Sequence, residues 1–261
     1  MTILKGLDPN DFIHPHEKAC LNTLRGAGVN TVVEKLASVS NRLTLEVKLM
    51  GQYLRVSEKD MPELYTMLRE VCSVLDYPAV PDIFTCRSEK FQWQIVIRET
   101  PAIILTDFVL NDFDEGMLRF HLGCAVTALK ARTCHLRMAI DFARPLLLAI
   151  PIAGPASYPL LSGWARAAVL SEDRGGLLAC QDVNAAYRCL MRMIGIPRKD
   201  IDVSTLPDYL AAYAPDSAIS GMTQGVQTMV SDRPWNNDRL LELYKWVQSG
   251  QYDDLLDQAS A

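Results

Sequence analysis

The stretch DEGMLRFHLGCAVTALKARTCH, residues 114–135, is the most informative part of this sequence for predicting the fold. The acidic residues of NDFDEG, 111–116, precede a run of helix formers, which predicts that a helix begins there with carboxylates at its positive end. His121 and Cys124 stand three residues apart, so this helix would present both side chains on one face. The stretch therefore predicts a helix that carries a candidate site.

Three short runs of β-branched and aromatic residues come before this helix. Polar turns separate them, as expected for the strands of a small sheet. The runs are DIFTC (82–86), FQWQIVIR (91–98) and PAIILTD (101–107). Their order along the chain predicts a sheet that is followed directly by the helix.

Most of the remaining sequence has helical periodicity. The segment from Pro15 to about Leu75 is mainly helical by pattern, and two further apolar periodic segments follow Trp164. Asp182 would cap the second of them. The polar stretch 214–237 indicates a short helix and a loop before a final amphipathic helix. We therefore predict an α+β fold that is mostly helical, with a small sheet.

The chain is long enough to bury a large core. It has 261 residues, of which 49% are hydrophobic and 22% charged, an ordinary globular composition. We find no repeat and no low-complexity linker, so we predict a single domain over 1–261. Residues 1–60 are predicted to be a helical N-terminal extension that packs on this domain.

Charge and cysteine usage restrict the partners and the compartment. A formal net charge of −5 argues against nucleic acid, because binding to phosphates depends on clustered lysines and arginines. The seven cysteines form no C-x-x-C pair and follow no signal peptide, which favours the cytoplasm. The apolar stretch 142–165 contains four prolines, which interrupt a membrane-spanning helix. A peripheral membrane contact of this stretch stays open.

Several stretches of the chain, in their order, resemble one protein family. They are PAIILTDFVLNDFDEGMLRFHLG, WARAAVLSEDRGGLLACQD and SDRPWNNDRLLELYKWVQSGQY. From about residue 62 to the C-terminus, they resemble the soluble part of the HtpX-like and CAAX-prenyl-protease-like zinc metallopeptidases. The resemblance implies a gluzincin, zincin-like metallopeptidase fold.

The resemblance also implies that the zinc site is lost. In that family H-E-x-x-H supplies two zinc ligands and a glutamate that activates water, and E-x-x-x-D supplies a third ligand. The two histidines fall on Cys124 and Ala128, the active-site glutamate on Ala125 and the ligand glutamate on Val169. We therefore predict no metal, no cofactor and no catalytic residue at these positions.

Three charged residues lie at other positions of the family's pattern. Its E-x-x-x-D aspartate is retained as Asp173, and we predict that Asp173 and Arg174 form an internal salt bridge or a helix-orienting pair. In the stretch that resembles S-H-P-x-x-x-x-R, Arg233 takes the place of the histidine before Pro234. Arg233 would bind a carboxylate in the former cleft or lie on a solvated loop, and we favour the loop.

The strand AIILTD suggests how such a protein would still bind a peptide. The resemblance implies that this strand forms the upper edge of the cleft and pairs with extended substrate by strand addition. The backbone of Ala102, Ile103, Ile104 and Leu105 would then capture a peptide without cutting it. The alternative is that the N-terminal helices cover this edge of the sheet.

Two kinds of reused chemistry are alternatives at the predicted helix. Cys124 would be a thiol nucleophile with His121 as its base, although no third group is evident. A displaced metal site would need Cys134 and His135 as well, and these lie about 15 Å further along a straight helix. We favour packed or surface side chains over both.

The sequence therefore predicts a pseudopeptidase, a metallopeptidase-like protein without peptidase activity. It would bind a peptide or protein partner as a scaffold, regulator or accessory factor. One alternative is an enzyme that reuses the cleft, with Cys124, His121, Asp173 and Arg233 as candidate groups. The other is a structural subunit that contacts a larger assembly through an outer helical face.

Overall fold

The computed structural model describes residues 1–26, 47, 49, 51–89, 91–138, 153–213 and 233–260. Parts of three predicted segments fall outside them. These are residues 27–46, 48 and 50 of the predicted helical segment from Pro15 to about Leu75, residues 142–152 of the proline-rich stretch and residues 214–232 of the polar stretch.

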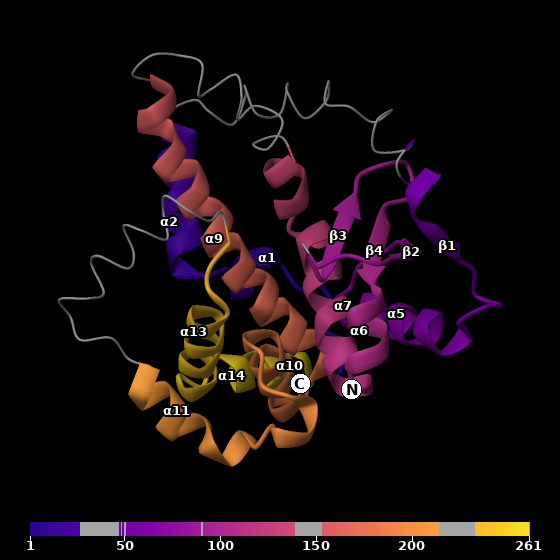
Figure 1. Ribbon diagram of the computed structural model, residues 1–261. Helices are drawn as coiled ribbons and strands as arrows, with labels where there is room; N and C mark the ends of the chain where they lie inside the picture. The colour runs from indigo at the N-terminus through magenta and orange to yellow at the C-terminus, as the bar shows by residue number, and fades with distance from the viewer. Residues whose placement is uncertain are drawn as a thin grey trace.

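A four-stranded sheet lies at one side of the molecule (Figure 1). Its strands are β1 (Leu54–Val56), β2 (Asp82–Cys86), β3 (Trp93–Val96) and β4 (Ala102–Thr106), in the order β1-β2-β4-β3. β2 and β4 run parallel, and the two outer strands are antiparallel to their neighbours. The three predicted strands are confirmed. β1 is an additional strand, within the segment from Pro15 to about Leu75 that was predicted to be mainly helical. The sequence did not indicate it, because three residues are too few to show the alternation of a strand.

The other regular elements of the described residues are helices, so the α+β, mostly helical prediction is confirmed. The α-helices are α1 (Pro9–Phe12), α2 (Pro15–Gly26), α5 (Pro62–Val74), α6 (Asp107–Asp112), α7 (Glu115–Lys130), α9 (Ala153–Cys180), α10 (Val183–Ile194), α11 (Leu206–Tyr213), α13 (Asn236–Gln248) and α14 (Gln251–Ser260). Two short 3-10 turns, η1 (Arg198–Asp200) and η2 (Val203–Thr205), lie between α10 and α11.

Aspartate caps define where two of the predicted helices begin. The Asp114 side chain accepts a hydrogen bond from the Met117 backbone N–H at 2.9 Å, at the start of α7. Asp182 accepts from the Ala185 N–H at 2.9 Å at the start of α10. Each cap satisfies a backbone donor that has no partner inside its helix. Both helix starts were predicted from the sequence.

Helices α7 and α9 pack against each other in the middle of the molecule (Figure 1). Phe120, Leu122 and Val126 of α7 are fully buried, and they share one apolar core with Ile103 and Leu105 of β4. Helix α10 packs on both α7 and α9, and α13 packs on α9 and α10. The long helices are therefore held mainly by burial of apolar surface.

The first residues of the chain belong to the same core. Leu4, Leu7 and Phe12 are buried, and the Leu4 N–H donates to the Val74 carbonyl at 2.9 Å. Helix α2 packs along α9. The division of the chain into a domain and an extension over 1–60 stays a prediction.

The strand order corrects the predicted edge role of Ala102–Leu105. This segment is β4, which pairs with β2 on one side and with β3 on the other. Both rows of its backbone groups are therefore used within the sheet, and β4 cannot accept a peptide by strand addition. The outer strand beside β4 is β3, which the sequence pattern alone could not place.

Helix α9 continues the end of the apolar stretch. It begins at Ala153 and runs through Pro159 without ending there. Within the part of the chain that the structure describes, no helix has both the length and the hydropathy needed to cross a bilayer. The peripheral membrane contact stays a prediction, because residues 142–152 lie outside the described part.

Candidate functional site

The candidate site lies where α7 crosses α9, and glycines allow the two helices to come close. A Cβ atom on Gly123 would lie 2.5 Å from the Ala179 Cβ, and one on Gly176 would lie 2.5 Å from the Cys124 Sγ. Either would collide with its neighbour, so both positions require glycine. The close crossing leaves the face of α7 that contains Cys124 directly against α9.

The positions expected for zinc ligands are buried parts of this packing. Cys124, Ala125 and Ala128 are at most 1% exposed and belong to the main core. Val169, one turn before Asp173 on α9, is 6% exposed. Apart from the Cys124 thiol, the side chains at these four positions are apolar and typical of a packed helix interface.

Asp173 and Arg239 form a buried ion pair beside Cys124. The Arg239 Nε donates to Asp173 Oδ2 at 2.9 Å, and its Nη2 donates to Oδ1 at 2.7 Å. Asp173 is 1% exposed and Arg239 is 8% exposed. The Cys124 thiol donates to Asp173 Oδ1 at 3.7 Å. Both oxygens of the retained carboxylate are thus engaged by side chains of this chain.

The charge state of this cluster follows from its burial. Burial disfavours the guanidinium charge, but attraction to Asp173 outweighs it and raises the pKa of Arg239. Burial, together with the Asp173 carboxylate, raises the pKa of Cys124 well above its ordinary value. Cys124 is therefore a protonated thiol, whereas a nucleophile or a metal ligand must be a thiolate.

His121 lies in an aromatic environment. Its ring meets Phe113 edge-on at 5.2 Å and Trp93 at 6.4 Å between centroids. It is fully buried, and neither ring nitrogen has a hydrogen-bond partner within the described residues. Burial and the positive charges of Arg239 and Arg233 lower the pKa of His121 to about 3. His121 is therefore a neutral ring, and the hydrogen-bond partner of the Cys124 thiol is Asp173 instead.

The donor groups do not fit a zinc site. Zinc takes about three protein ligands in catalytic sites and four in structural sites. Cys124 supplies one protonated thiol, and Asp173 is already bonded to Arg239. Over the described ranges, no three histidine, cysteine, aspartate or glutamate side chains come together as a metal site would require. Cys134 and His135 contact each other at 3.4 Å and do not join this cluster.

The predicted pairing of Asp173 with Arg174 is wrong. Arg174 points from α9 toward the N-terminal segment and donates to the Phe12 and Ile13 carbonyls at 3.4 and 3.3 Å. Its guanidinium also lies over the Trp246 ring at 5.1 Å. Adjacent residues on a helix point in directions about 100° apart, so they do not face each other.

Arg239 is the residue that the sequence interpretation missed. It closes the stretch RPWNNDR, 233–239, where the family's pattern S-H-P-x-x-x-x-R ends in arginine. The arginine that ends this pattern was therefore the signal for Arg239. The prediction concerned Arg233 instead, because it takes the place of the histidine. Arg233 has an exposed side chain just before α13, and its charge still affects His121. Arg239 joins α13 to α9 through its bonds to Asp173.

A second buried polar cluster joins α2 to α9. The Ser171 hydroxyl donates to Glu17 Oε2, while the neighbouring Glu172 accepts from the Thr133 hydroxyl at 2.7 Å and from Arg137 at 3.1 Å. Burial raises the pKa of Glu17 to about 7, and Ser171 opposes this shift. No pattern in the sequence pointed to this cluster.

The chain is similar to one curated metallopeptidase along nearly its whole length. It is 24% identical to the plastoglobule-localized metallopeptidase 48, chloroplastic, of Arabidopsis thaliana over 273 aligned positions. The match covers 99% of this chain and 78% of that protein. No family model and no solved structure matches the chain. The similarity supports a metallopeptidase-like protein, in agreement with the coarser part of the sequence prediction.

Proposed function

We propose that this chain is a metallopeptidase-like binding protein that has lost zinc peptidase chemistry. The observation that carries the proposal is the burial of Cys124, Ala125 and Ala128 in the apolar core, at the positions expected for zinc ligands and the active-site glutamate. The carboxylate of Asp173 is bonded to Arg239, and Cys124 is a thiol hydrogen-bonded to that same carboxylate, so neither group is open to a metal ion. The chemistry of the donor set, with a protonated thiol and no general base, supports binding rather than hydrolysis.

The outer edge of β3 is the proposed place for an extended peptide. The Thr106 N–H donates to the Gln92 carbonyl, so in the antiparallel register Gln94 and Val96 direct their backbone groups toward β4. The backbone groups of Trp93 and Ile95 then point outward. Among the described residues, no strand pairs with this side of β3. An added strand would therefore find free donors and acceptors at Trp93 and Ile95.

One face of β3 next to this edge is apolar. Trp93 is buried against the main core and meets His121 of α7. Ile95 lies on the same face of β3, because alternate residues of a strand share a face. A bound peptide would place every second side chain on this apolar face, which is how strand addition gains specificity.

The first test measures metal and hydrolysis together. The full chain, prepared without tag histidines or chelator, is analysed for zinc content, titrated with zinc and incubated with casein and a mixed peptide library. We expect no stoichiometric zinc and no cleavage, because Cys124 is an uncharged thiol and Asp173 is already paired with Arg239. Stoichiometric zinc that is lost in Cys124→Ala, or zinc-dependent cleavage, would overturn the proposal.

The second test compares two substitutions at one position of β3. Ile95→Pro removes an outward N–H without removing a bond of the β3–β4 ladder, whereas Ile95→Thr keeps that N–H. An array of unbiased decapeptides is probed with the wild-type chain and both variants. We expect Ile95→Pro to lose peptide binding and Ile95→Thr to retain it. Equal binding by both variants would argue against the β3 edge.

An enzyme with different chemistry at Cys124 and His121 has no comparable support. Burial raises the pKa of Cys124 and lowers the pKa of His121, so these two groups are neither a thiolate nor a base in this setting. We keep a peptide or protein partner and a cytoplasmic location as proposals. The location in the relative's name, the chloroplast plastoglobule, is a property of that protein.

A further inference from the structure

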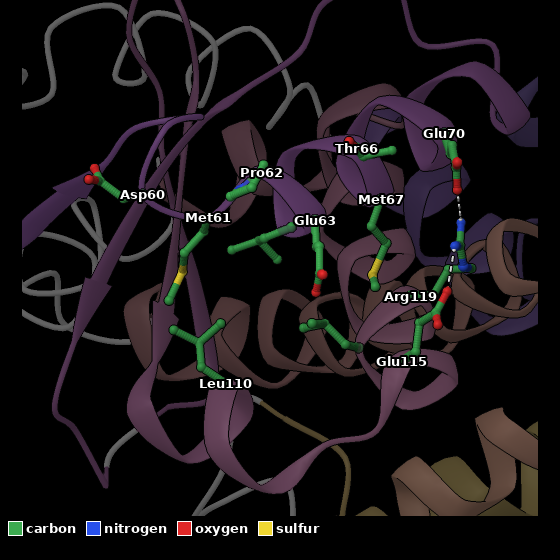
Figure 2. A pocket seen from close by; sticks show the side chains of 12 residues that line it. Asp60, Met61, Pro62, Glu63, Thr66, Met67, Glu70, Leu110, Glu115 and Arg119 are labelled. Carbon is green, nitrogen blue, oxygen red and sulfur yellow. Dashed lines mark hydrogen bonds and ion pairs between the residues drawn. The ribbon is translucent and has the colours of Figure 1, made fainter.

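A groove of about 860 Å³ opens beside α5 (Figure 2). Its walls come from α5 and the turn before it, from α6, and from the first turns of α7. No residue of α9 or α13 lines it. The apolar side chains that line it are Met61, Pro62, Leu64, Met67, Leu110 and Leu118. The groove is therefore separate from both the former zinc positions and the β3 edge.

Acidic side chains surround this apolar floor. The groove is lined by four carboxylates and one guanidinium, a formal charge of −3. The guanidinium of Arg119 is bonded to Glu70 at 2.6 Å and to Glu115 at 3.1 Å, so it offers no uncompensated positive charge. Figure 2 shows these ion pairs at one end of the groove, Asp60 at the other and Glu63 between them. The lining therefore presents negative charge along its whole length.

Two of the four acids, Asp60 and Glu63, stand apart from Arg119. Hydrogen bonds from the Ser57 hydroxyl and backbone N–H lower the pKa of Asp60. Glu63 lies in the first turn of α5, where the helix dipole favours a negative charge, and it has no ion-pair partner in the described part of the chain. A partner with positive charges beside its apolar side chains would complement this arrangement.

The shape of the groove favours a helix over an extended strand. Its lining residues lie on helices and on one turn, and no sheet edge is among them, so an extended peptide would find no ladder of free backbone groups. Helix α5 follows the groove from Pro62 to Glu70, about 12 Å or about two helical turns at about 1.5 Å per residue. Methionines such as Met61 and Met67 adapt to the side chains of a docked helix.

We propose that this groove binds a basic amphipathic helix of a partner protein, with large apolar side chains on one face and lysines or arginines beside them. The helix places its apolar face on Met61, Leu110 and Leu118, and its cations lie near Asp60, Glu63 and Glu115. This site does not depend on peptide binding at the β3 edge.

The probe for the experiment is a fluorescein-labelled helical peptide of leucine and lysine, with leucines at helical spacing on one face. A peptide with the same leucines and glutamate in place of lysine is the reference. Fluorescence anisotropy at physiological ionic strength gives the affinity for the full chain. We expect the lysine peptide to bind and the glutamate peptide to show no saturable binding.

Two substitutions in the groove test its location without endangering the fold. Met61→Ser removes an apolar wall at the N-cap of α5, where Met61 makes no side-chain capping bond and serine is a favoured residue. Glu63→Lys reverses an exposed charge in the first turn of the helix. The matched control is Asp208→Lys, which reverses an exposed charge in the first turn of α11. Circular dichroism melting checks that all variants remain folded.

We expect the combined Met61→Ser and Glu63→Lys variant to weaken lysine-peptide binding by about tenfold or more. Asp208→Lys should change the affinity by less than about twofold, and Ile95→Pro should leave it unchanged. Equal weakening by Asp208→Lys would assign the binding to net charge and overturn the site. Unchanged affinity in the groove variant, or equal binding of the glutamate peptide, would overturn it as well. Loss of peptide-array binding in Ile95→Pro alone bears on the β3 edge and leaves this groove intact.

Discussion

Replacing Arg239 by methionine isolates the energetic role of the buried ion pair. Methionine keeps much of the apolar length of the arginine side chain but cannot donate to Asp173. The substitution removes two bonds to Asp173, at 2.9 and 2.7 Å, and one bond to Asn236 at 3.2 Å. Asp173, which is 1% exposed, would then be a buried carboxylate with the Cys124 thiol as its remaining partner.

Breaking a buried ion pair from one side costs about 3 to 5 kcal/mol, because the partner charge stays buried. Domains of this kind have about 5 to 15 kcal/mol of stability in total, so Arg239→Met should remove a large share of it. Replacing both partners with apolar residues, Asp173→Leu with Arg239→Met, removes the isolated charge. The double variant should therefore be more stable than Arg239→Met alone.

Urea unfolding followed by circular dichroism measures these free energies, with the slope checked for constancy between variants. The matched control is Arg69→Met, which breaks the exposed pair with Glu58, whose side chains are 43% and 61% exposed. That pair should contribute about 0 to 1 kcal/mol. The reasoning is refuted if Arg239→Met costs no more than Arg69→Met, or if the Asp173 and Arg239 substitutions are additive.

Three further predictions concern single buried groups. Burial raises the pKa of Glu17 from 4.5 to about 7, so the folded chain retains a proton that the unfolded chain has lost between these values. The free energy of unfolding should therefore fall as pH rises through this window, by at most about 1.4 kcal/mol per pH unit, and Glu17→Gln should flatten this dependence in urea titrations. Cys124 should react with iodoacetamide much more slowly than half-buried Cys86 when labelled peptides of the folded chain are quantified by mass spectrometry. His121→Leu should leave the free energy of unfolding unchanged or increase it, because two unpaired buried nitrogens disappear; a loss of more than about 2 kcal/mol would contradict this.

The local features of the fold were accessible from the sequence. The helix start within 111–116, the cap at Asp182 and the three runs that became β2, β3 and β4 were predicted in place. Each depends on residues a few positions apart, whose effects on the backbone are short-ranged. The resemblance to the metallopeptidases also gave the expectation that Cys124 and Ala128 stand in place of zinc ligands and Ala125 in place of the active-site glutamate, and this stays a prediction.

The order of the strands was decided by tertiary structure. The run PAIILTD is apolar at successive positions, and such a run is compatible with an edge strand under a covering element or with a central strand. The ladders on both of its sides settle the question in favour of the centre. Whether a strand lies at the edge of a sheet depends on which other strands pair with it, and a local sequence pattern contains no information on that pairing.

The partner of Asp173 was likewise a tertiary result. The sequence places Arg174 beside it, but the helix turns that side chain away, and the bonded arginine lies 66 residues further along the chain. The same holds for Glu17 and Ser171, which are 154 residues apart. The sequence by itself determined most of the helices and three of the four strands, since these depend on residue type and close spacing. Which charges face each other inside the protein was decided only by packing, because a buried charge is stabilised by whichever partner the fold brings within hydrogen-bond distance.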